Sequence, residues 1–343
     1  MTSTLRSHGP FQAQNGTDSG ADHNLRIHPS QPWLAPLAGF SDLPFRLLCR
    51  EFGCKVACTE MVSAKGLVYR SPGTVDLVRT CPEDQALVVQ LFGAEADFLG
   101  EALDILLNQG LRYFDLNAGC PVKKVVKTGA GGGLLRTWDH LLKLASLMVE
   151  RVGPGRVGIK VRAGWSSPEE ILEHVDTFQD MGLGWLTLHP RTVTQGYSGR
   201  ANWDVLAAVC KRLHLPVLAS GDLFTAEDGH RCLHQTGASG LMFARGALAD
   251  PGIFRSFMQG DSAWDRQEVS APIRAVHMAK RHIHLTQEYG ESSNGLLKMR
   301  TIIPRYLRGF QGVKEIRCRV VACTSWEELL QCLSAIESDT RGL

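Results

Sequence analysis

The sequence lacks a long hydrophobic run and an excess of charge of one sign. No stretch of its 343 residues reaches the roughly 18 uninterrupted apolar residues of a membrane span, and residues 1–31 hold no apolar core of a secretory signal. Its 37 Lys and Arg stand against 35 Asp and Glu, which leaves a net charge of only +2. With 44% hydrophobic residues, the composition excludes a wholly disordered or fibrous chain. These features predict a cytoplasmic globular protein that has no membrane partner.

Cysteines paired at metal-binding spacing are also missing. The ten cysteines stand at irregular intervals, and Cys49, Cys54 and Cys58 form no CxxC pair and have no histidine nearby. In a long chain without a secretory signal, this favours reduced, buried thiols over a disulfide framework. A metal site at this cluster is the less favoured alternative, and we expect no metal.

No GxGxxG segment follows the first apolar run, so a Rossmann sheet has little support. The sequence has instead eight short apolar or β-branched runs, each followed by a loop and a helical pattern. They begin at Trp33, Val56, Ala86, Tyr113, Arg156, Trp185, Pro216 and Gly240. Strands that alternate with helices predict parallel pairing, because parallel strands need crossover connections. Eight such units within roughly 220 residues predict an α/β fold of the (β/α)8 TIM-barrel type.

The chain divides into three predicted segments. Residues 1–31 are rich in Ser, Gly, Asn and Gln, which predicts a disordered tail, and the barrel occupies residues 32–258. Residues 271–343 have helical patterns without strands and predict a small all-helical domain. Between Ala271 and Val320, ten Lys and Arg stand against three acids, a net charge of +7. Positive charge is therefore concentrated in the helical domain, although the whole chain is nearly neutral.

The chemistry of a TIM barrel lies at the carboxyl ends of its strands, where this sequence has many polar residues. The candidate site residues there are Pro36, Leu37, Ala38, Gln90, Asn117, Cys120, Lys160, His189, Arg191, Ser220, Gly221, Asp222, Ala244 and Arg245. Lys160 lies between apolar neighbours, so it needs an anionic ligand or a carboxylate as partner. Gly221 and Gly246 follow the seventh and eighth strands, where they suit either tight turns or a phosphate site. Lys160 and Arg245 favour the phosphate site.

Cys120 and His189 are the candidates for proton transfer and ligand contact. Cys120 follows a strand in an Asn-x-Gly-Cys-Pro turn, which predicts a side chain in the barrel mouth rather than an inert buried thiol. A thiol with a pKa of about 8.5 keeps its proton at neutral pH and can act as a general acid. His189 stands in a His-Pro-Arg segment, and we expect it to face a ligand; the alternative is a core histidine.

These segments resemble the tRNA-dihydrouridine synthases, a family of flavin-dependent barrel reductases. The matching segments are Ala35–Arg46, Val88–Gly93, Asp115–Leu135, Ile159–Trp165, Leu188–Trp203, Ser220–Leu223, Ala244–Leu248 and Lys298–Gly312. The most specific is NAGCPVKK, Asn117–Lys124, and Tyr197–Gly199 is most similar to the bacterial B-type branch. The resemblance covers the barrel and continues into the helical domain.

The resemblance implies an enzyme that reduces the C5=C6 bond of a D-loop uridine in tRNA to 5,6-dihydrouridine, with FMN as cofactor and NADPH as reductant. FMN would contact Pro36, Leu37, Ala38, Gln90, Lys160 and His189, and its phosphate would be held by Ser220, Gly221, Asp222, Ala244 and Arg245. Cys120 would give a proton to C5 after hydride addition at C6, and Asn117 and Arg191 would contact the uracil. The uridine must be extruded from the folded tRNA to reach this site.

Binding of tRNA needs further contacts, which we expect from positively charged side chains. These are Lys123, Lys124, Arg300 and Arg305. For Tyr306 and Phe310 we favour packing in the helical core over stacking on bases. We expect a monomer with no protein partner, since RNA access needs an open barrel mouth.

Two positions depart from the family pattern, and two alternative functions stay open. Ser220 stands where the family usually has Asn, and Ala244 where it usually has Gly, so FMN binding is expected to weaken. One alternative is a flavin barrel reductase of a small pyrimidine or enone, for which a basic helical domain is superfluous. The other is a tRNA-binding protein with a decayed flavin site.

Overall fold

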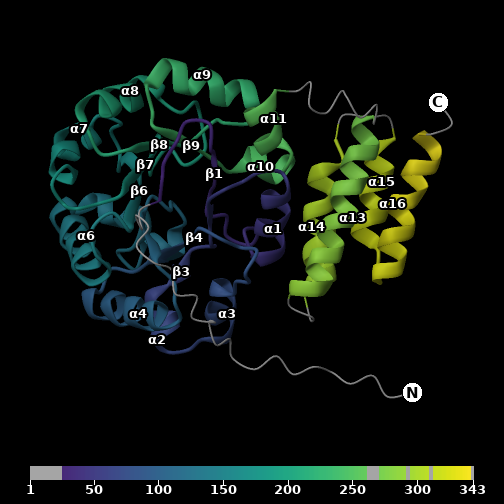
Figure 1. The fold of residues 1–343 in the computed structure, drawn as a ribbon, viewed down its shortest axis with the longest axis horizontal. Coiled ribbons are helices and arrows are strands. Elements are labelled where there is room, and N and C mark those ends of the chain that lie inside the picture. Colours follow the sequence, from purple (N-terminus) through teal and green to yellow (C-terminus); the bar gives the residue numbers. More distant parts are fainter. Residues whose placement is uncertain (1–24, 261–269, 291–293, 309–311, 341–343) are drawn as a thin grey trace.

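A closed parallel β-barrel is followed by a bundle of helices in the computed structural model, which describes residues 25–260, 270–290, 294–308 and 312–340 (Figure 1). The strands are β1 (Trp33–Leu34), β2 (Ala57–Cys58), β3 (Val62–Ser63), β4 (Leu87–Phe92), β5 (Tyr113–Ala118), β6 (Val157–Gly164), β7 (Trp185–Thr192), β8 (Val217–Ala219) and β9 (Gly240–Phe243). They pair in parallel in the order β2-β1-β9-β8-β7-β6-β5-β4, and β2 also pairs with β4, which closes the ring. The TIM-barrel prediction is confirmed.

The second predicted strand is divided in the structure. The apolar run that begins at Val56 forms two short strands, β2 and β3, instead of one, and both pair with β4. Between them, the Thr59 hydroxyl accepts a hydrogen bond from the Gln90 backbone N–H at 3.1 Å and donates one to the Glu60 carbonyl at 2.7 Å. A side chain thus replaces a ladder hydrogen bond, and the prediction of one continuous strand is wrong.

The helices cover the outside of the barrel and form the bundle at its side. On the barrel they are α1 (Leu43–Glu51), α2 (Ala64–Val68), α3 (Pro72–Val75), α4 (Ala96–Asn108), α5 (Lys123–Val126), α6 (Trp138–Val152), α7 (Glu170–His174), α8 (Trp203–Arg212), α9 (Ala226–Thr236), α10 (Arg245–Ala249) and α11 (Ile253–Gln259). The bundle holds α13 (Ala271–Tyr289), α14 (Gly295–Tyr306), α15 (Val313–Ala322) and α16 (Trp326–Thr340). No helix among the described residues has the length and apolar character that crossing a membrane requires.

Local sequence signals set where these helices begin and end. The Asp42 carboxylate caps α1 by accepting a hydrogen bond from the Phe45 N–H at 3.3 Å, and Pro44 stands in the first turn, where a proline fits. Helix α9 begins at a capping box formed by Thr225 and Asp228. It ends at Gly237, whose φ of +67° suits a glycine.

Alternation along the strands separates the barrel interior from the layer beneath the helices. Both faces are buried, as expected of parallel strands covered by helices. One set of alternate residues packs toward the helices, including Val89, Leu116, Ile159 and Leu188. The other set fills the interior: a lower apolar cluster includes Trp33, Val88, Trp185, Leu218 and Met242, and polar residues follow further along the same strands. The interior therefore changes from apolar to polar toward the strand carboxyl ends.

The tail predicted for residues 1–31 lies mostly outside the described residues. Of the part that is described, Leu25 and Ile27 pack against the lower apolar cluster, and the Ile27 side chain lies close to Gly240 of β9. The described end of the predicted tail therefore contacts the barrel through Leu25 and Ile27.

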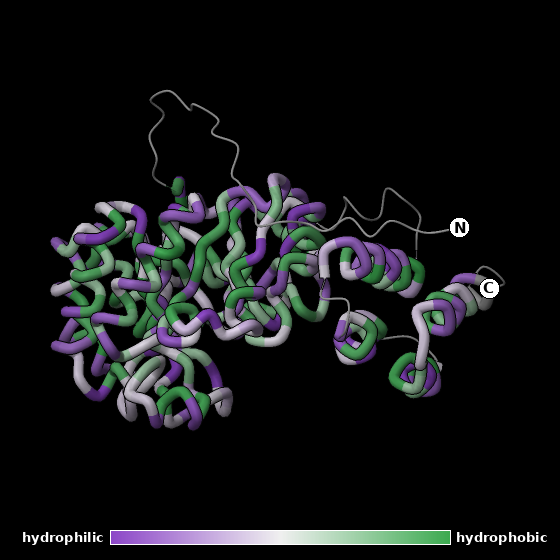
Figure 2. Tube along the Cα trace, turned by 90° about the horizontal axis from the view of Figure 1, so that it is seen from below, coloured by the Kyte–Doolittle hydropathy of each residue, from purple (hydrophilic) through white to green (hydrophobic). Residues whose placement is uncertain are grey.

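The helical bundle packs directly on the barrel and shares its core. Helix α13 packs on α1, and α14 on α10. The His282 ring lies 5.6 Å from the Phe45 ring, and its Nδ1 is 2.8 Å from the Tyr306 hydroxyl. Hydrophobic and hydrophilic residues alternate around these helices, as in amphipathic helices (Figure 2). Tyr306 is buried, so the prediction of core packing is confirmed, whereas Phe310 lies outside the described residues.

Candidate active site at the barrel mouth

A buried polar network lies above the apolar cluster of the barrel. The Gln90 amide donates to Asp115 at 2.8 Å, and the Asn117 amide donates to the Gln90 oxygen at 2.7 Å. The Trp185 indole N–H donates to the other Asp115 oxygen at 3.2 Å. Neighbouring parallel strands bring these residues together, because Gln90 pairs with Asp115 and Asn117 with Lys160 in the sheet. The network fixes the floor of the mouth.

Two opposite charges lie in this interior. Burial raises the pKa of Asp115 to about 6, against hydrogen bonds and the Lys160 charge that lower it. Burial lowers the pKa of Lys160 to about 8, against the Asp115 charge that raises it. Both groups are mostly charged at pH 7, so Asp115 is the carboxylate that the sequence required as a partner for Lys160.

The Asn117 side chain shapes the turn that carries Cys120. Its Oδ1 accepts hydrogen bonds from the Gly119 and Cys120 backbone N–H groups at 3.2 and 3.0 Å. Arg162 Nε donates to the Gly119 carbonyl at 3.0 Å, and the Gly132 N–H donates to the Cys120 carbonyl at 2.9 Å. Cys120 is only partly buried, and burial raises the pKa of its thiol. The thiol therefore keeps its proton at neutral pH.

An arginine–aspartate cluster lies on the opposite strands. Asp222 accepts two hydrogen bonds from Arg191, at 2.8 and 2.7 Å, and one from Arg245 at 3.1 Å. Its backbone is left-handed with a φ of +56°, which is uncommon for a residue other than glycine. Burial alone would raise the pKa of Asp222, but the bonds from Arg191 and Ala201 and the two arginine charges lower it overall. Asp222 thus stays ionised and holds both arginines.

A cavity opens between these groups. Among the predicted site residues it is lined by Pro36, Leu37, Lys160, His189, Ser220, Gly221, Asp222, Ala244 and Arg245. Gly221 has a φ of +106°, and a Cβ there would lie 2.5 Å from the His189 ring, so this close approach requires glycine. Burial, then the nearby cationic residues, hold the pKa of His189 well below its usual range, so its ring is neutral.

Two predicted cofactor residues do not line this cavity. Gln90 is buried beneath it in the polar network, and Ala38 is exposed beyond its edge. Ala244, one of the two departures from the family pattern, has a φ of −123°. That value lies outside the left-handed region that favours glycine.

Sequence reasoning missed the role of Tyr197 in the site. Its ring is 62% exposed at the rim of the cavity, with the Arg162 guanidinium 5.4 Å and the Arg245 guanidinium 5.1 Å from the ring centre. Arg162 is held in place by the Thr192 and Gly196 carbonyls. The available signal in the sequence was an aromatic residue, Tyr197, between Arg191 and Arg200. The sequence does not show, however, that the loop after β7 turns back over the mouth.

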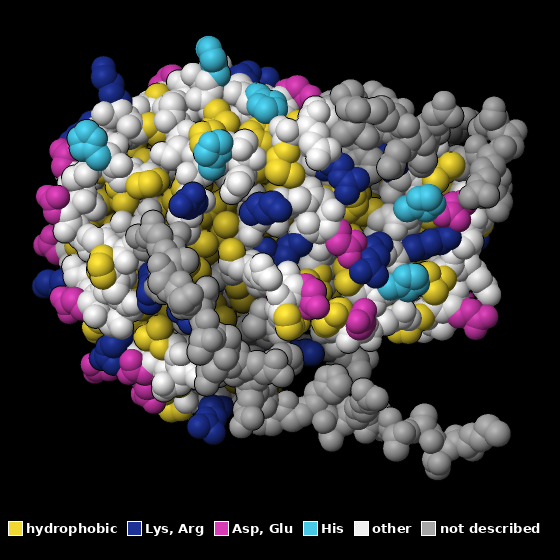
Figure 3. Space-filling view, viewed as in Figure 1, with side chains coloured by type: hydrophobic (Ala, Val, Ile, Leu, Met, Phe, Trp, Pro, Cys, Tyr) yellow, Lys and Arg dark blue, Asp and Glu magenta, His cyan; other side chains and the backbone are white. Residues whose placement is uncertain are grey.

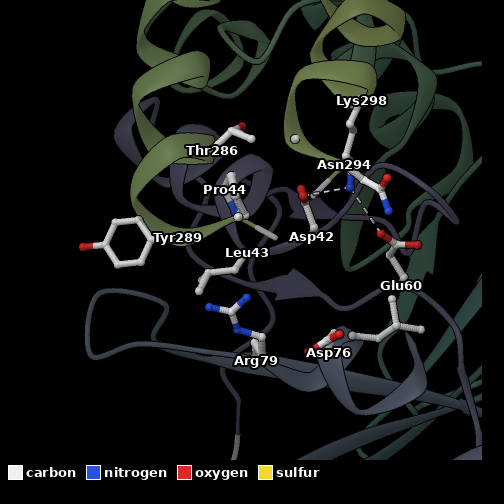
Figure 4. Close-up of a pocket in the computed structure, with 13 residues that line it drawn as sticks. Asp42, Leu43, Pro44, Glu60, Asp76, Arg79, Thr286, Tyr289, Asn294 and Lys298 are labelled. Atoms are coloured by element: carbon white, nitrogen blue, oxygen red, sulfur yellow. Dashed lines mark ion pairs between the residues drawn. The ribbon is translucent and has the colours of Figure 1, made fainter. Parts of the chain in front are cut away.

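Lys298 of the helical bundle lies between two carboxylates of the barrel, in a separate pocket between α1 and helices α13 and α14 (Figure 4). Lys298 Nζ is 2.7 Å from Asp42 and 3.7 Å from Glu60. The other Glu60 oxygen accepts a hydrogen bond of 2.5 Å from the N–H of Gly39, in the loop that includes Leu37. An ion pair on α14 is therefore linked to a wall of the cavity.

The residues predicted to contact RNA lie in two places. Lys123 and Lys124 are exposed on α5, directly after the Cys120 turn. Arg300 and Arg305 are half-buried on α14, and the Arg305 guanidinium lies 4.9 Å from the Phe40 ring centre. Within the described part of the chain, the buried Nε atoms of both arginines have no hydrogen-bond partner.

Comparisons with known proteins agree with this arrangement. The dihydrouridine synthase family matches residues 33–340. The probable tRNA-dihydrouridine synthase 1 of Synechocystis sp. is 33% identical over 307 residues, 89% of this chain and 85% of the relative. The tRNA-dihydrouridine synthase B of Pasteurella multocida is 30% identical over 305 residues, 88% of this chain and 91% of the relative. Morphinone reductase aligns over 67% of this chain and 86% of its own, with 14% identity and a TM-score of 0.49. The chain belongs to the dihydrouridine synthase family.

Proposed function

We propose that this protein reduces the C5=C6 bond of a D-loop uridine in tRNA to 5,6-dihydrouridine, with FMN as cofactor and NADPH as reductant. The observation that carries the proposal is the Cys120 thiol on the loop after β5, which keeps its proton and lies within range of the charge of Lys160, a residue that lines the cavity. Membership of the dihydrouridine synthase family and the named relatives support the substrate class.

The cavity lining suits FMN, a flat aromatic ring that carries a phosphate. Leu37 and Met242 provide apolar walls, and Lys160 and Arg245 provide positive charge. Gly221 and His189 both line the cavity, and the missing side chain of Gly221 lets the two approach each other closely. Bound FMN would supply the hydride that adds at C6, having received it from NADPH. The Lys160 ammonium favours negative charge on a ligand in the cavity.

Cys120 provides the second half of the addition. Saturation of C5=C6 needs one hydride and one proton, and a thiol with a raised pKa holds its proton until the substrate arrives. The turn built by Asn117 fixes the Cys120 backbone, so the direction of the thiol is determined before binding. We assign the proton delivered to C5 to this thiol.

The uracil contacts expected of Asn117 and Arg191 remain predictions. In the described residues both side chains already have partners: Asn117 bonds to Gln90 and to the Cys120 turn, and Arg191 to Asp222 and the Gly199 carbonyl. We propose that each side chain positions a neighbour. Asn117 positions the Cys120 thiol, and Arg191 positions the Asp222 carboxylate, which in turn holds Arg245.

Positive charge on both parts of the molecule supports tRNA binding. Lys123 and Lys124 lie beside the mouth, and Arg300 and Arg305 lie on α14. On the face shown in Figure 3, Lys and Arg side chains extend from the barrel across to the helical bundle. Phosphates of a folded RNA that spans both parts would contact such side chains, and the affinity would fall as salt rises.

The variant Cys120→Ala tests the proposal. We expect it to bind FMN and to oxidise NADPH like the wild type, while dihydrouridine formation falls roughly 100-fold or more, the usual contribution of a positioned general acid. Cys318→Ala, which removes an exposed thiol of α15, is the control and should keep full activity. Full dihydrouridine yield from Cys120→Ala would contradict the role of the thiol.

A further inference from the structure

A second hollow adjoins the proposed FMN cavity. We call it the side groove and define it by Tyr197, Arg200, Trp203, Phe224, Arg231 and Arg245. It lies between the loops after β7 and β8 and helices α8 and α9. Tyr197, Phe224 and Arg245 line both hollows. A ligand that enters the cavity can therefore extend into the side groove without leaving the protein surface.

The side groove presents aromatic rings and guanidinium groups together. The Tyr197 and Phe224 rings are 62% and 47% exposed, and the Arg245 guanidinium lies 5.1 Å and 4.7 Å from their centres. The Arg231 guanidinium lies 5.7 Å from the Trp203 ring centre. Exposed rings can stack on the base of a nucleotide, and the neighbouring arginines can contact its phosphates.

Polar groups of the side groove are also available to a ligand. Among the described residues, the exposed side chains of Arg200, Asp204 and Gln235 have no hydrogen-bond or ion-pair partner. Asp228, by contrast, is occupied by the start of α9 and by Arg231 at 2.6 Å. A guanidinium, a carboxylate and an amide match a phosphate, ribose hydroxyls and an exocyclic amine.

We propose that the side groove binds the adenosine-phosphate half of NADPH, while the nicotinamide half contacts the bound FMN at the opening of its cavity. This inference rests on the proposed function, because it requires a nicotinamide dinucleotide as reductant. The groove and the cavity share Tyr197, Phe224 and Arg245, so one dinucleotide can reach the flavin and the groove together. Arg200, which has no carboxylate partner among the described residues, is the residue to which we assign contact with a phosphate of the adenosine half.

The modest charge of the side groove favours a dinucleotide over tRNA. Helices α8 and α9, which carry Trp203 and Arg231, lie along the upper side of the barrel, and α13–α16 lie at its right (Figure 1). Only the Arg245 end of the groove is close to the bundle, because α10 begins at Arg245 and packs on α14. Its four arginines, Arg191, Arg200, Arg231 and Arg245, stand against Asp204, Asp222 and Asp228, a local excess of one positive charge that suits the few phosphates of a dinucleotide better than the extended backbone of an RNA. Binding of tRNA in the side groove is the alternative that the experiment below tests.

The test separates the reductive half-reaction from tRNA binding. FMN-loaded protein is mixed with NADPH without oxygen and without tRNA, and the loss of flavin absorbance gives the NADPH concentration at half-maximal rate. For Arg200→Glu we expect this concentration to rise at least about tenfold, as for loss of a charge-assisted contact, with unchanged affinity for FMN and for tRNA. Arg112→Glu, the same charge change at an exposed site at the opposite end of the barrel, should behave like the wild type.

A second measurement needs no variant. Adenosine 2′,5′-bisphosphate, a fragment of NADPH, should inhibit flavin reduction competitively with NADPH in the wild type and more weakly in Arg200→Glu. An unchanged NADPH response in Arg200→Glu would overturn the inference, as would lost tRNA affinity with normal flavin reduction. If NADPH does not reduce the wild-type flavin at all, the proposed reductant fails, and this inference fails with it.

Discussion

The buried pair of Asp115 and Lys160 shows how single residues determine the chemistry of the mouth. Burial is the largest influence on the pKa of each group, so each one is charged at a free-energy cost that the opposite charge of the other partly offsets. A barrel filled with aliphatic side chains at this level would be expected to be more stable. The pair therefore serves the cavity above it by keeping a cation beneath a bound ligand.

This view predicts how stability depends on pH. The folded-state pKa of Asp115, about 6, lies above the ordinary value of about 3.9, so folding favours the protonated carboxyl. That contribution is present below the ordinary pKa and is lost as the pH rises through 6. The variant Asp115→Asn has no carboxyl to titrate and does not lose this contribution. Between roughly pH 4 and pH 7, its free energy of unfolding should therefore rise by about 3 kcal/mol relative to that of the wild type, at about 1.36 kcal/mol per pKa unit.

Urea unfolding of the FMN-free protein across this pH range measures the difference. Asp104→Asn is the matched control, because Asp104 pairs with Arg151 at the surface, where both side chains are nearly half exposed. We expect no comparable change for it. Parallel pH profiles for Asp115→Asn and the wild type would contradict the pKa assigned to Asp115.

At this scale the sequence predicted where the site residues stand but not what each one contacts. Polar residues at strand ends identify the mouth because every parallel strand ends there. The partners depend on loops: Asp222 reaches Arg191 and Arg245 only because its backbone is left-handed, and no local motif indicates that. For the same reason the sequence assigned Arg191 to the substrate and overlooked its bond to Asp222.

Between elements, the decisive contact is the ion pair of α14 with the start of α1. Lys298 neutralises Asp42, the cap of α1, and lies close to Glu60, which holds the loop of Gly39 and Leu37. Burial raises the pKa of Glu60, although the Gly39 hydrogen bond and the Lys298 charge lower it. Without Lys298, two carboxylates would face each other behind the loop of Gly39 and Leu37, and only Leu37 of these residues lines the cofactor cavity.

We therefore expect Lys298→Met to weaken FMN binding several-fold as well as to destabilise the fold by about 2 kcal/mol, since it leaves partly buried carboxylates unpaired. Titration of the FMN-free protein with FMN, followed by quenching of flavin fluorescence, measures the affinity. Lys280→Met removes an ion pair of similar burial within the bundle, between Lys280 and Glu337 at 2.8 Å. If both variants bind FMN equally well, the link between α14 and the cavity is refuted.

Elements with strong periodicity were predictable, and irregular ones were not. Eight apolar runs predicted the barrel because period and spacing depend only on local sequence. The division of the second strand into β2 and β3 depends on a hydrogen bond between Thr59 and Gln90, which are 31 residues apart, and no local pattern contains it. Ion pairs between α1 and α14 are non-local in the same way.

The whole molecule combines a narrow reactive mouth with a broad basic surface. The barrel and the bundle share one hydrophobic core, so α14 and the mouth keep a fixed relation to each other. A free pyrimidine would need only the cavity, whereas a tRNA would contact the bundle as well. The net charge of +7 between Ala271 and Val320 is therefore the property of the whole molecule that favours the RNA substrate.

The most direct measurement is the dihydrouridine content of tRNA by mass spectrometry of its nucleosides. The purified protein would be incubated with FMN, NADPH and tRNA from cells that lack the modification, and fragments of the same tRNA would then be mapped. Our account predicts that dihydrouridine appears, that it maps to the D-loop, and that it requires NADPH. Unmodified tRNA in the presence of bound flavin that NADPH reduces would contradict it.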